Sequence, residues 1–217
     1  QLKQPVNRNT IIKISFVLVT IAILFMFRVI PNTFDSFLYS AFSKITGERE
    51  PDSSIVIIHI NSEDIEQLGP WPLKRSYYAL LINNLSSYNV KKIGLEVFLS
   101  AKFASQAIYD NVLQKEISKS KNVVFSSLAG SLTENNNYFI TDSLSFPSPK
   151  LINEQIPTGH INFIRNYGIE IPLQISNQAT KEKAFSLSLI DVNKAYPKKI
   201  KINFISQWNK FKNYSLV

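Results

Sequence analysis

Cysteine is absent from this sequence, and there are only one methionine and two histidines. Without cysteine the chain has no disulfide, no thiolate nucleophile and no cysteine-rich zinc site. His59 lies inside an apolar run and His160 lies beside a glycine, and we interpret both as structural residues rather than metal ligands. No nucleophile motif, phosphate-binding loop or zinc-ligand spacing is present. The sequence therefore predicts a protein that is not an enzyme and has no cofactor or metal.

Negative charge is scarce: the sequence has 16 acidic and 24 basic residues, which gives a formal net charge of +8. Much of the excess lies in the C-terminal part of the chain, at Lys181, Lys183, Lys194, Lys198, Lys199, Lys201, Lys210 and Lys212. We interpret these lysines as a solvated surface, and an anionic membrane or an acidic partner is the alternative. Nucleic-acid binding is not expected, because no recognisable module interleaves arginine with aromatic residues.

Charge is missing altogether from residues 14–27, between Lys13 and Arg28. A helix that spans a bilayer needs about 20 residues, and we predict one over residues 11–30, after a short polar segment of residues 1–10. The two flanking cations can reach the headgroups. A cleaved signal peptide is less consistent with the sequence, because no small-residue cleavage site follows. A buried helix of a soluble domain is disfavoured because the run is apolar all round.

The next segment, residues 31–50, is predicted to be an amphipathic helix that connects the membrane span to a domain. Its apolar residues recur at helical spacing, at Phe34, Phe37, Leu38, Phe42 and Ile45. We interpret them as packing against the domain. The alternative is a position at the membrane interface, where aromatic residues are enriched.

From Ile55 to Leu99 the sequence has the pattern of strand, loop, helix and strand. The helix, from Arg75, is expected to bury a face made of Tyr77, Leu81, Leu85 and Tyr88. In the second strand, residues 93–99, the odd positions are apolar and the even ones face the other way. A right-handed crossover should place this strand parallel to the first, residues 55–60.

Two further elements extend this unit. A second helix is predicted from Ser105, as N-cap, to Lys119, with a stripe of Ile108 or Tyr109, Val112 or Leu113, and Ile117. Residues 122–125 are predicted to form a third, buried strand. Residues 55–127 therefore indicate an open α/β sheet covered by helices.

The remainder alternates polar loops with short apolar runs. Residues 130–148 are interpreted as a long loop, mobile at 134–137. Residues 159–164 and 169–175 are predicted to form an antiparallel hairpin, followed by a helix over 185–196 and a strand over 201–205. The predicted fold is therefore α/β: an N-terminal transmembrane helix, then an open, largely parallel sheet with flanking helices and a C-terminal antiparallel hairpin.

A candidate ligand site follows from this arrangement, because ligands bind outside the carboxyl ends of parallel strands. Asn61 and Glu63 follow the first strand, Glu96 lies in the second, and Trp71 and Arg75 lie between them. We predict that these five residues line a polar cleft, in which Arg75 is placed to pair with Glu96. A structural role is the interpretation that we favour over a ligand site: Trp71 and its flanking prolines plug the edge of the sheet, and the pair of Arg75 with Glu96 holds the loop down.

Several short motifs lie along the chain after residue 50. They are the first strand with its acidic turn, Leu68-Gly69, Trp71-Pro72-Leu73-Lys74-Arg75, Glu96-Val97-Phe98-Leu99-Ser100, Gly159-His160-Ile161-Asn162-Phe163 and Ile171-Pro172-Leu173. Together they resemble the second family of CHASE domains, which are extracytoplasmic sensing modules, and the resemblance covers roughly residues 50 to 217. Asn61 and Glu96 stand where the family usually has aspartates.

The resemblance implies that residues 51–217 are an extracytoplasmic sensory domain, cut short at its C-terminal end. In that case the chain belongs to a bacterial signal-transduction protein, in which it passes a ligand or envelope signal to membrane helices and an output domain beyond residue 217. The expected location is the inner membrane, with a cytoplasmic N-terminus and the domain facing the periplasm. The expected partners are the lipid bilayer and either other membrane or envelope proteins or a second copy of the chain. The alternative is a non-enzymatic docking subunit of a cell-envelope complex.

Overall fold

The structure is a computed structural model of the chain. It describes residues 8–26, 32–100, 107–135, 138–152, 155–165, 169–178, 180–190, 196–202 and 207–217. The chain divides into two compact units, Gln1–Glu48 and Arg49–Val217, and each is described by itself.

Two helices, α1 (Arg8–Met26) and α2 (Asn32–Thr46), form the N-terminal unit. Residues 8–25 of α1 are long and apolar enough to cross a membrane by length and composition, and none of them is buried. Phe16, for example, is 73% exposed, so α1 is not a buried core helix. The helix predicted over residues 31–50 is confirmed as α2, and its Phe37, Phe42 and Ile45 are exposed.

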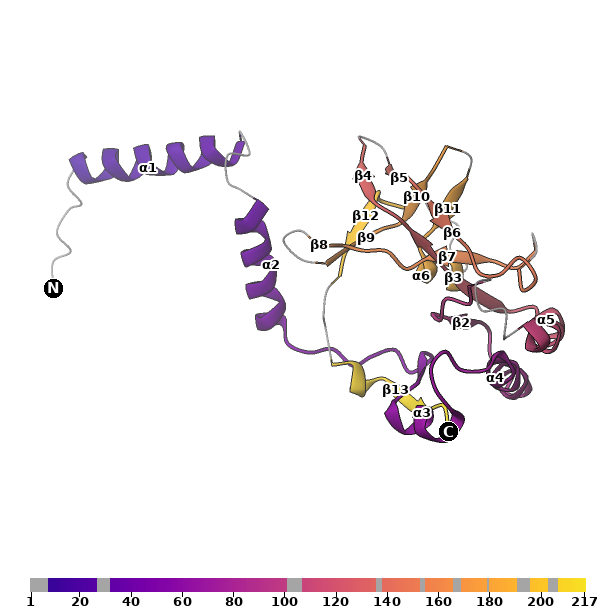
Figure 1. Ribbon diagram of the computed structural model, residues 1–217. Coiled ribbons are helices and arrows are strands. Elements are labelled where there is room, and N and C mark those ends of the chain that lie inside the picture. The colour runs from indigo at the N-terminus through magenta and orange to yellow at the C-terminus, as the bar shows by residue number, and fades with distance from the viewer. Residues whose placement is uncertain are drawn as a thin grey trace. The chain divides into compact units, whose positions relative to one another are not determined.

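A parallel sheet lies at the centre of the second unit (Figure 1). Strand β3 (Val123–Ala129) runs parallel to β2 (Ile93–Leu95) on one side and to β7 (Thr158–His160) on the other. The short β6 (Leu144–Ser145) pairs antiparallel with the far end of β3. The first five residues of β3 are buried, as expected for a strand covered on both faces. The predicted third strand and the parallel sheet are therefore confirmed.

Helices cover both faces of this sheet. On one face, α4 (Arg75–Ser87) and α5 (Ala107–Ser120) pack against each other and enclose the core with Ile93 and Leu95. On the other face, α6 (Phe185–Leu189) lies against Gly94 and Gly159. A Cβ atom on Gly159 would come within 2.5 Å of the Phe185 Cα atom, so the close approach of α6 requires glycine at this position.

The predicted face of α4 is half-buried, with Tyr77 and Leu85 packed against the core, and the fully buried face lies next to it. The structure buries Arg75, Tyr78, Ala79 and Ile82, whereas Tyr88 is 79% exposed. Two apolar stripes lie next to each other on this helix, one through Tyr77 and Leu81 and the other through Tyr78 and Ile82. Helical spacing alone fits either stripe, and packing selects the one that includes the small side chain of Ala79.

For α5 the sequence left open which residue of each pair, Ile108 or Tyr109 and Val112 or Leu113, faces the core, and the structure decides both. Leu113 and Ile117 are fully buried and Tyr109 is half-buried, whereas Ile108 and Val112 are exposed. The predicted N-cap, Ser105, lies outside the described residues.

The first strand, β1 (Val56–His59), does not pair with β2 as predicted. It pairs in parallel with β13 (Lys212–Ser215), near the end of the chain, and its register runs from Val56 opposite Lys212 to His59 opposite Ser215. Consecutive strands are neighbours only about two-thirds of the time, and a crossover does not by itself fix which strand becomes the neighbour. The pattern of β1, exposed at Val56 and half-buried beyond it, indicates a strand at the rim of the core.

The C-terminal half forms two further small sheets. One has the order β11 (Lys181–Lys183), β10 (Gln174–Ser176), β5 (Phe139–Thr141) and β4 (Leu132–Glu134). The other has the order β12 (Lys199–Lys201), β9 (Ile169–Pro172) and β8 (Ile164–Arg165).

The predicted hairpin is confirmed in its central part, where β8 and β9 are antiparallel. Residues 158–160, however, belong to the parallel sheet as β7. The predicted 130–148 loop contains β4, β5 and β6, which are too short to show an alternating pattern. The helix predicted over 185–196 is described only as α6, and residue 192 lies outside the described residues. The strand predicted over 201–205 is β12, which begins two residues earlier, and residues 203–205 are not described.

Candidate functional site

The predicted cleft is a small hollow between the start of α4 and the segment after β2. Its volume is about 50 Å³, and Trp71, Arg75, Val97 and Phe98 are among the residues that line it. Ligand pockets usually measure about 300–1,000 Å³, and one water molecule occupies about 30 Å³ of liquid. The hollow therefore has room for one or two water molecules.

Arg75 is already engaged within the protein. Its side chain is buried, and its guanidinium forms an ion pair with the Asp110 carboxylate of α5 and donates to the Ser100 carbonyl after β2. The predicted partner Glu96 is exposed, and the pairing of Arg75 with Glu96 is wrong. Asp110 lies on the buried stripe of α5 with Leu113 and Ile117, and it therefore meets the buried guanidinium. Arg75 thus ties α4, α5 and the end of β2 together.

Asn61 caps the helix that follows β1, α3 (Ser62–Leu68). The Asn61 side-chain oxygen accepts a hydrogen bond from the Asp64 amide at 2.9 Å, and Asp64 Oδ2 accepts one from the Asn61 amide at 2.7 Å. This reciprocal pair is a capping box. Glu63, in the first turn of the same helix, is exposed.

Asp64 also holds the last strand. Its Oδ1 atom accepts hydrogen bonds from the Ser215 hydroxyl at 2.7 Å and from the Val217 amide at 3.0 Å. Asn61 Nδ2 donates to the Ser215 oxygen at 3.1 Å. We call the group Asn61, Asp64, Ser215 and Val217 the C-terminal latch.

The electrostatics of the latch favour the ionised carboxylate. Burial acts to raise the pKa of Asp64, but hydrogen bonds from Ser215, Asn61, Val217 and Leu216 outweigh it and hold the pKa below its ordinary value. The Asp64 carboxylate is therefore ionised at neutral pH.

Of the five predicted site residues, only Trp71 and Arg75 line the same hollow. Asn61 belongs to the latch, and Glu63 and Glu96 are exposed. The prediction missed Asp64, Asp110 and Ser215. The Asn-x-x-Asp spacing is typical of a capping box and could have identified Asp64 from the sequence. Asp110 could have been identified because it is a charged residue on the apolar stripe of α5.

The two histidines are both partly or fully buried. The His59 ring lies edge-on to Trp208, with the ring centroids 5.6 Å apart. His160 is buried in β7 opposite Ser127 of β3, whose hydroxyl donates to Glu182 at 2.7 Å. Burial lowers the pKa of His160 to about 4, and the Pro172 carbonyl opposes this shift. His160 is therefore neutral at physiological pH.

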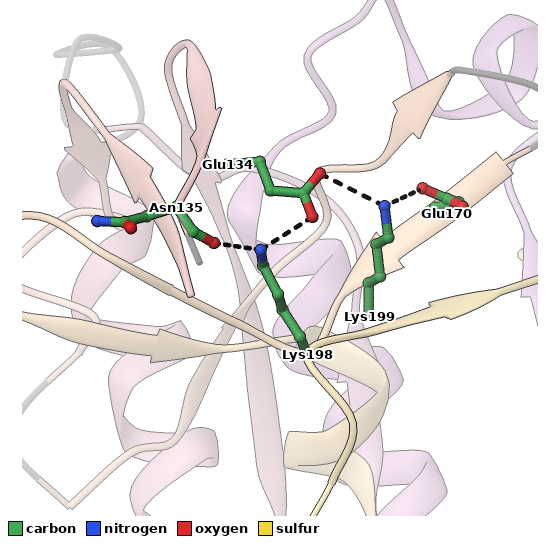
Figure 2. Close-up of polar contacts among 5 residues, drawn as sticks. All are labelled: Glu134, Asn135, Glu170, Lys198 and Lys199. Atoms are coloured by element: carbon green, nitrogen blue, oxygen red, sulfur yellow. Dashed lines mark hydrogen bonds and ion pairs between the residues drawn. The ribbon is translucent and has the colours of Figure 1, made fainter. Parts of the chain in front are cut away.

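Figure 2 shows a second polar cluster, which joins the two small sheets. Lys198 Nζ lies 2.9 Å from Glu134 Oε1 and also donates to the Asn135 carbonyl. Lys199 Nζ lies 3.4 Å from Glu134 Oε2 and 2.8 Å from Glu170 Oε2. The pKa of Glu134 is lowered mainly by its hydrogen bond from Lys198. The pKa of Lys199 is raised mainly by the hydrogen bond that Lys199 donates to Glu170. We call Glu134, Glu170, Lys198 and Lys199 the inter-sheet clamp.

Within the described ranges, no group of three or more histidine or acidic residues is placed to hold a metal ion. The polar clusters instead join one element to another: α4 to α5, α3 to β13, and β4 to β12.

A family model of the CHASE2 domain matches residues 16–215, nearly the whole chain. No curated protein and no solved structure matches. The match includes the latch residues Asn61, Asp64 and Ser215, the Trp71–Arg75 segment and the inter-sheet clamp. The chain therefore belongs to the CHASE2 family, a family of extracytoplasmic sensory domains in signalling proteins.

Proposed function

We propose that the chain is the sensory part of a bacterial signal-transduction protein, anchored in the inner membrane by α1 with its second unit in the periplasm. The second unit receives a ligand or envelope signal and passes it to membrane helices and an output domain beyond residue 217. The observation that carries the proposal is the parallel pairing of β1 with β13. Through this pair, the first and last strands of the sensory unit form one ribbon.

We infer that this ribbon has two arrangements, one latched and one released. In the structure, Asp64 holds Ser215 and Val217 against the start of α3. In a signalling domain, a stimulus shifts the population between the latched ribbon and one in which β13 has moved. A movement of β13 then reaches the segment that follows it.

The periplasmic location is tested by cysteine labelling, for which the cysteine-free chain is well suited. Lys115→Cys lies at an exposed position of α5, and Ser126→Cys lies at a buried position of β3. A membrane-impermeant maleimide should label Lys115→Cys in intact spheroplasts and Ser126→Cys only after denaturation. Labelling of Lys115→Cys only after membrane lysis would place the domain in the cytoplasm and reject the proposal.

Signal transfer is tested by locking the ribbon. Val56 and Lys212 face each other in the β1–β13 register, so cysteines at both positions are placed to form a disulfide. In the full-length protein the oxidised double variant should give an output that no longer responds to the stimulus, and reduction should restore the response. The two single-cysteine variants are the controls. A locked protein that responds normally would exclude transmission through β13.

A second function, docking in a cell-envelope complex, is favoured by exposed apolar side chains on the two packed helices. They are Leu80 on α4 and Tyr88 directly after its end, and Ile108 and Val112 on α5. Exposed apolar surface of this kind commonly marks protein contacts. Purification of the full-length protein from solubilised membranes, with mass spectrometry, separates the two functions. Stoichiometric envelope proteins that are lost in Ile108→Lys would support docking, and recovery of the protein alone or as a homodimer would support the sensory function.

A further inference from the structure

A larger hollow lies at the β10–β11 hairpin, beside the start of β5. Its volume is about 390 Å³, within the usual range for small-ligand sites and well above that of the hollow at Trp71. Ile175, which is fully buried, belongs to its lining. The turn that borders it is ordered by Asn177, whose side-chain oxygen accepts from the Thr180 amide at 2.8 Å and from its hydroxyl at 3.1 Å.

Besides Asn177 and Thr180, the hollow is lined by five polar side chains. Those of Tyr138, Gln174, Ser176, Gln178 and Lys181 make no hydrogen bond or ion pair within the ranges that the structure describes. They belong to β10, to the turn, to β11 and to the residue before β5. Arg75 in the smaller hollow, by contrast, is already paired with Asp110. The larger hollow therefore combines ligand-sized space with several available donors and acceptors.

The chemistry of the lining selects a class of ligand. Two amides and two hydroxyls can donate and accept in several directions, which suits a molecule that carries several hydroxyl groups. Tyr138 adds a half-exposed aromatic ring, against which an apolar ring face can lie. Lys181 is the single charged residue of the lining, and no carboxylate lines the hollow. A negatively charged group on the ligand can therefore pair with the Lys181 ammonium.

We propose that this hollow binds a small sugar acid, with its hydroxyls on Gln174, Ser176 and Gln178, its ring against Tyr138 and its carboxylate at Lys181. This inference rests on the proposed sensory function, because it names the class of ligand that the domain detects. The hollow also adjoins the inter-sheet clamp. The Tyr138 carbonyl accepts from the Asn135 amide at 2.9 Å, and Lys198 donates to the Asn135 carbonyl and lies 4.9 Å from the Phe139 ring centroid. A ligand that contacts Tyr138 is therefore linked to the clamp through one hydrogen bond, from Asn135, and through Asn135 to its covalent neighbour Glu134.

Saturation-transfer NMR on the full chain in nanodiscs tests the proposal with three probes: D-glucuronate, D-glucose and acetate. We expect transfer to glucuronate, weaker transfer to glucose and none to acetate. Absence of transfer to glucuronate, or equal transfer to acetate, would overturn the proposal.

Variants of lining residues, each compared with a matched variant outside the hollow, test whether glucuronate binds in the hollow. Tyr138→Ala and Gln178→Ala should each weaken glucuronate binding about fivefold, the effect of losing one stacking or hydrogen-bonding partner. Tyr88→Ala, another exposed tyrosine, should bind as the wild type does. Lys181→Ala should reduce binding of glucuronate to that of glucose, whereas Lys183→Ala, two residues along β11 and outside the hollow, should not.

Binding that is unchanged in Tyr138→Ala and Lys181→Ala would also overturn the proposal. The sensory function would not fall with it, because the labelling and ribbon-locking experiments do not depend on the sugar acid. If instead glucuronate binds but the labelling and ribbon-locking experiments fail, the domain binds a ligand and does not transfer a signal.

Discussion

At the scale of single residues, the second unit compensates its buried charges in two ways. Asp110 is neutralised by a full countercharge, the Arg75 guanidinium, and both side chains are almost fully excluded from solvent. Asp64 is compensated instead by neutral donors, namely the Ser215 hydroxyl and the backbone amides of Asn61, Leu216 and Val217. The first arrangement fixes the packing of α4 on α5. The second depends on neutral donors from the last strand, which can move away without leaving an opposite charge behind.

Removal of the Arg75 side chain should be strongly destabilising. Breaking a buried ion pair from one side leaves an uncompensated charge and costs about 3–5 kcal/mol. We therefore expect Arg75→Ala to lower the free energy of unfolding by about that amount, measured in urea by the fluorescence of Trp71 and Trp208. Lys74→Ala, at the exposed neighbouring position, is the control and should have little effect. A loss below about 1 kcal/mol for Arg75→Ala would show that the pair is not buried in solution.

His160 should make stability fall on acidification. Its pKa is about 4 in the folded state, below the ordinary value of 6.5, so the unfolded state binds more protons between these two values. Stability from neutral His160 is complete above pH 6.5 and is lost as the pH falls towards 4, by about 3 kcal/mol in total.

Urea unfolding between pH 7 and pH 4 measures this loss. His160→Gln should flatten the dependence. Equal slopes in the wild type and His160→Gln would contradict the assignment.

At the scale of elements, β13 is held mainly by its pairing with β1 and by the latch. Asp64→Asn keeps the shape of the side chain but removes its negative charge and one acceptor. We expect faster amide hydrogen exchange in residues 212–217 of Asp64→Asn, with β3 unchanged. Glu66→Gln, on an exposed position of the same helix α3, is the control. Uniformly faster exchange over the whole unit would mean that Asp64 supports the global fold rather than β13.

The inter-sheet clamp should be weak and sensitive to salt. Its four side chains are partly exposed, and exposed ion pairs are worth about 0.2–1 kcal/mol. A double-mutant cycle with Glu134→Gln and Lys199→Met should give a coupling free energy in that range at low salt and close to zero at 1 M salt. A coupling that persists at 1 M salt would show a desolvated, rigid contact between the sheets.

Elements with strong periodicity were predictable from the sequence, and elements defined by distant partners were not. The apolar helix α1, the helices α4 and α5 and the buried strand β3 follow from local pattern. The pairing of β1 with β13 could not be predicted, because strands at opposite ends of a chain carry no mark of each other. The pairing of Arg75 with Asp110 could not be predicted either, because the sequence contains several acidic residues that could pair with Arg75 and does not distinguish among them.

At the scale of the whole molecule, the two units should be separable. A chain that lacks residues 1–48 should be recovered without detergent and keep the urea midpoint of the full chain, because Arg49–Val217 holds its own core. The full chain, with its exposed apolar α1, should require detergent or lipid. A lower midpoint in the shortened chain would show that α2 contributes to the stability of the second unit.

The parallel direction of β1 and β13 has a mechanical consequence. When the chain is pulled at the start of β1 and at the end of β13, the two strands are loaded along their length in opposite directions. Their hydrogen bonds then bear the load together, in shear, instead of opening one after another. A force transmitted along the chain between these two points therefore loads the β1–β13 pair in shear.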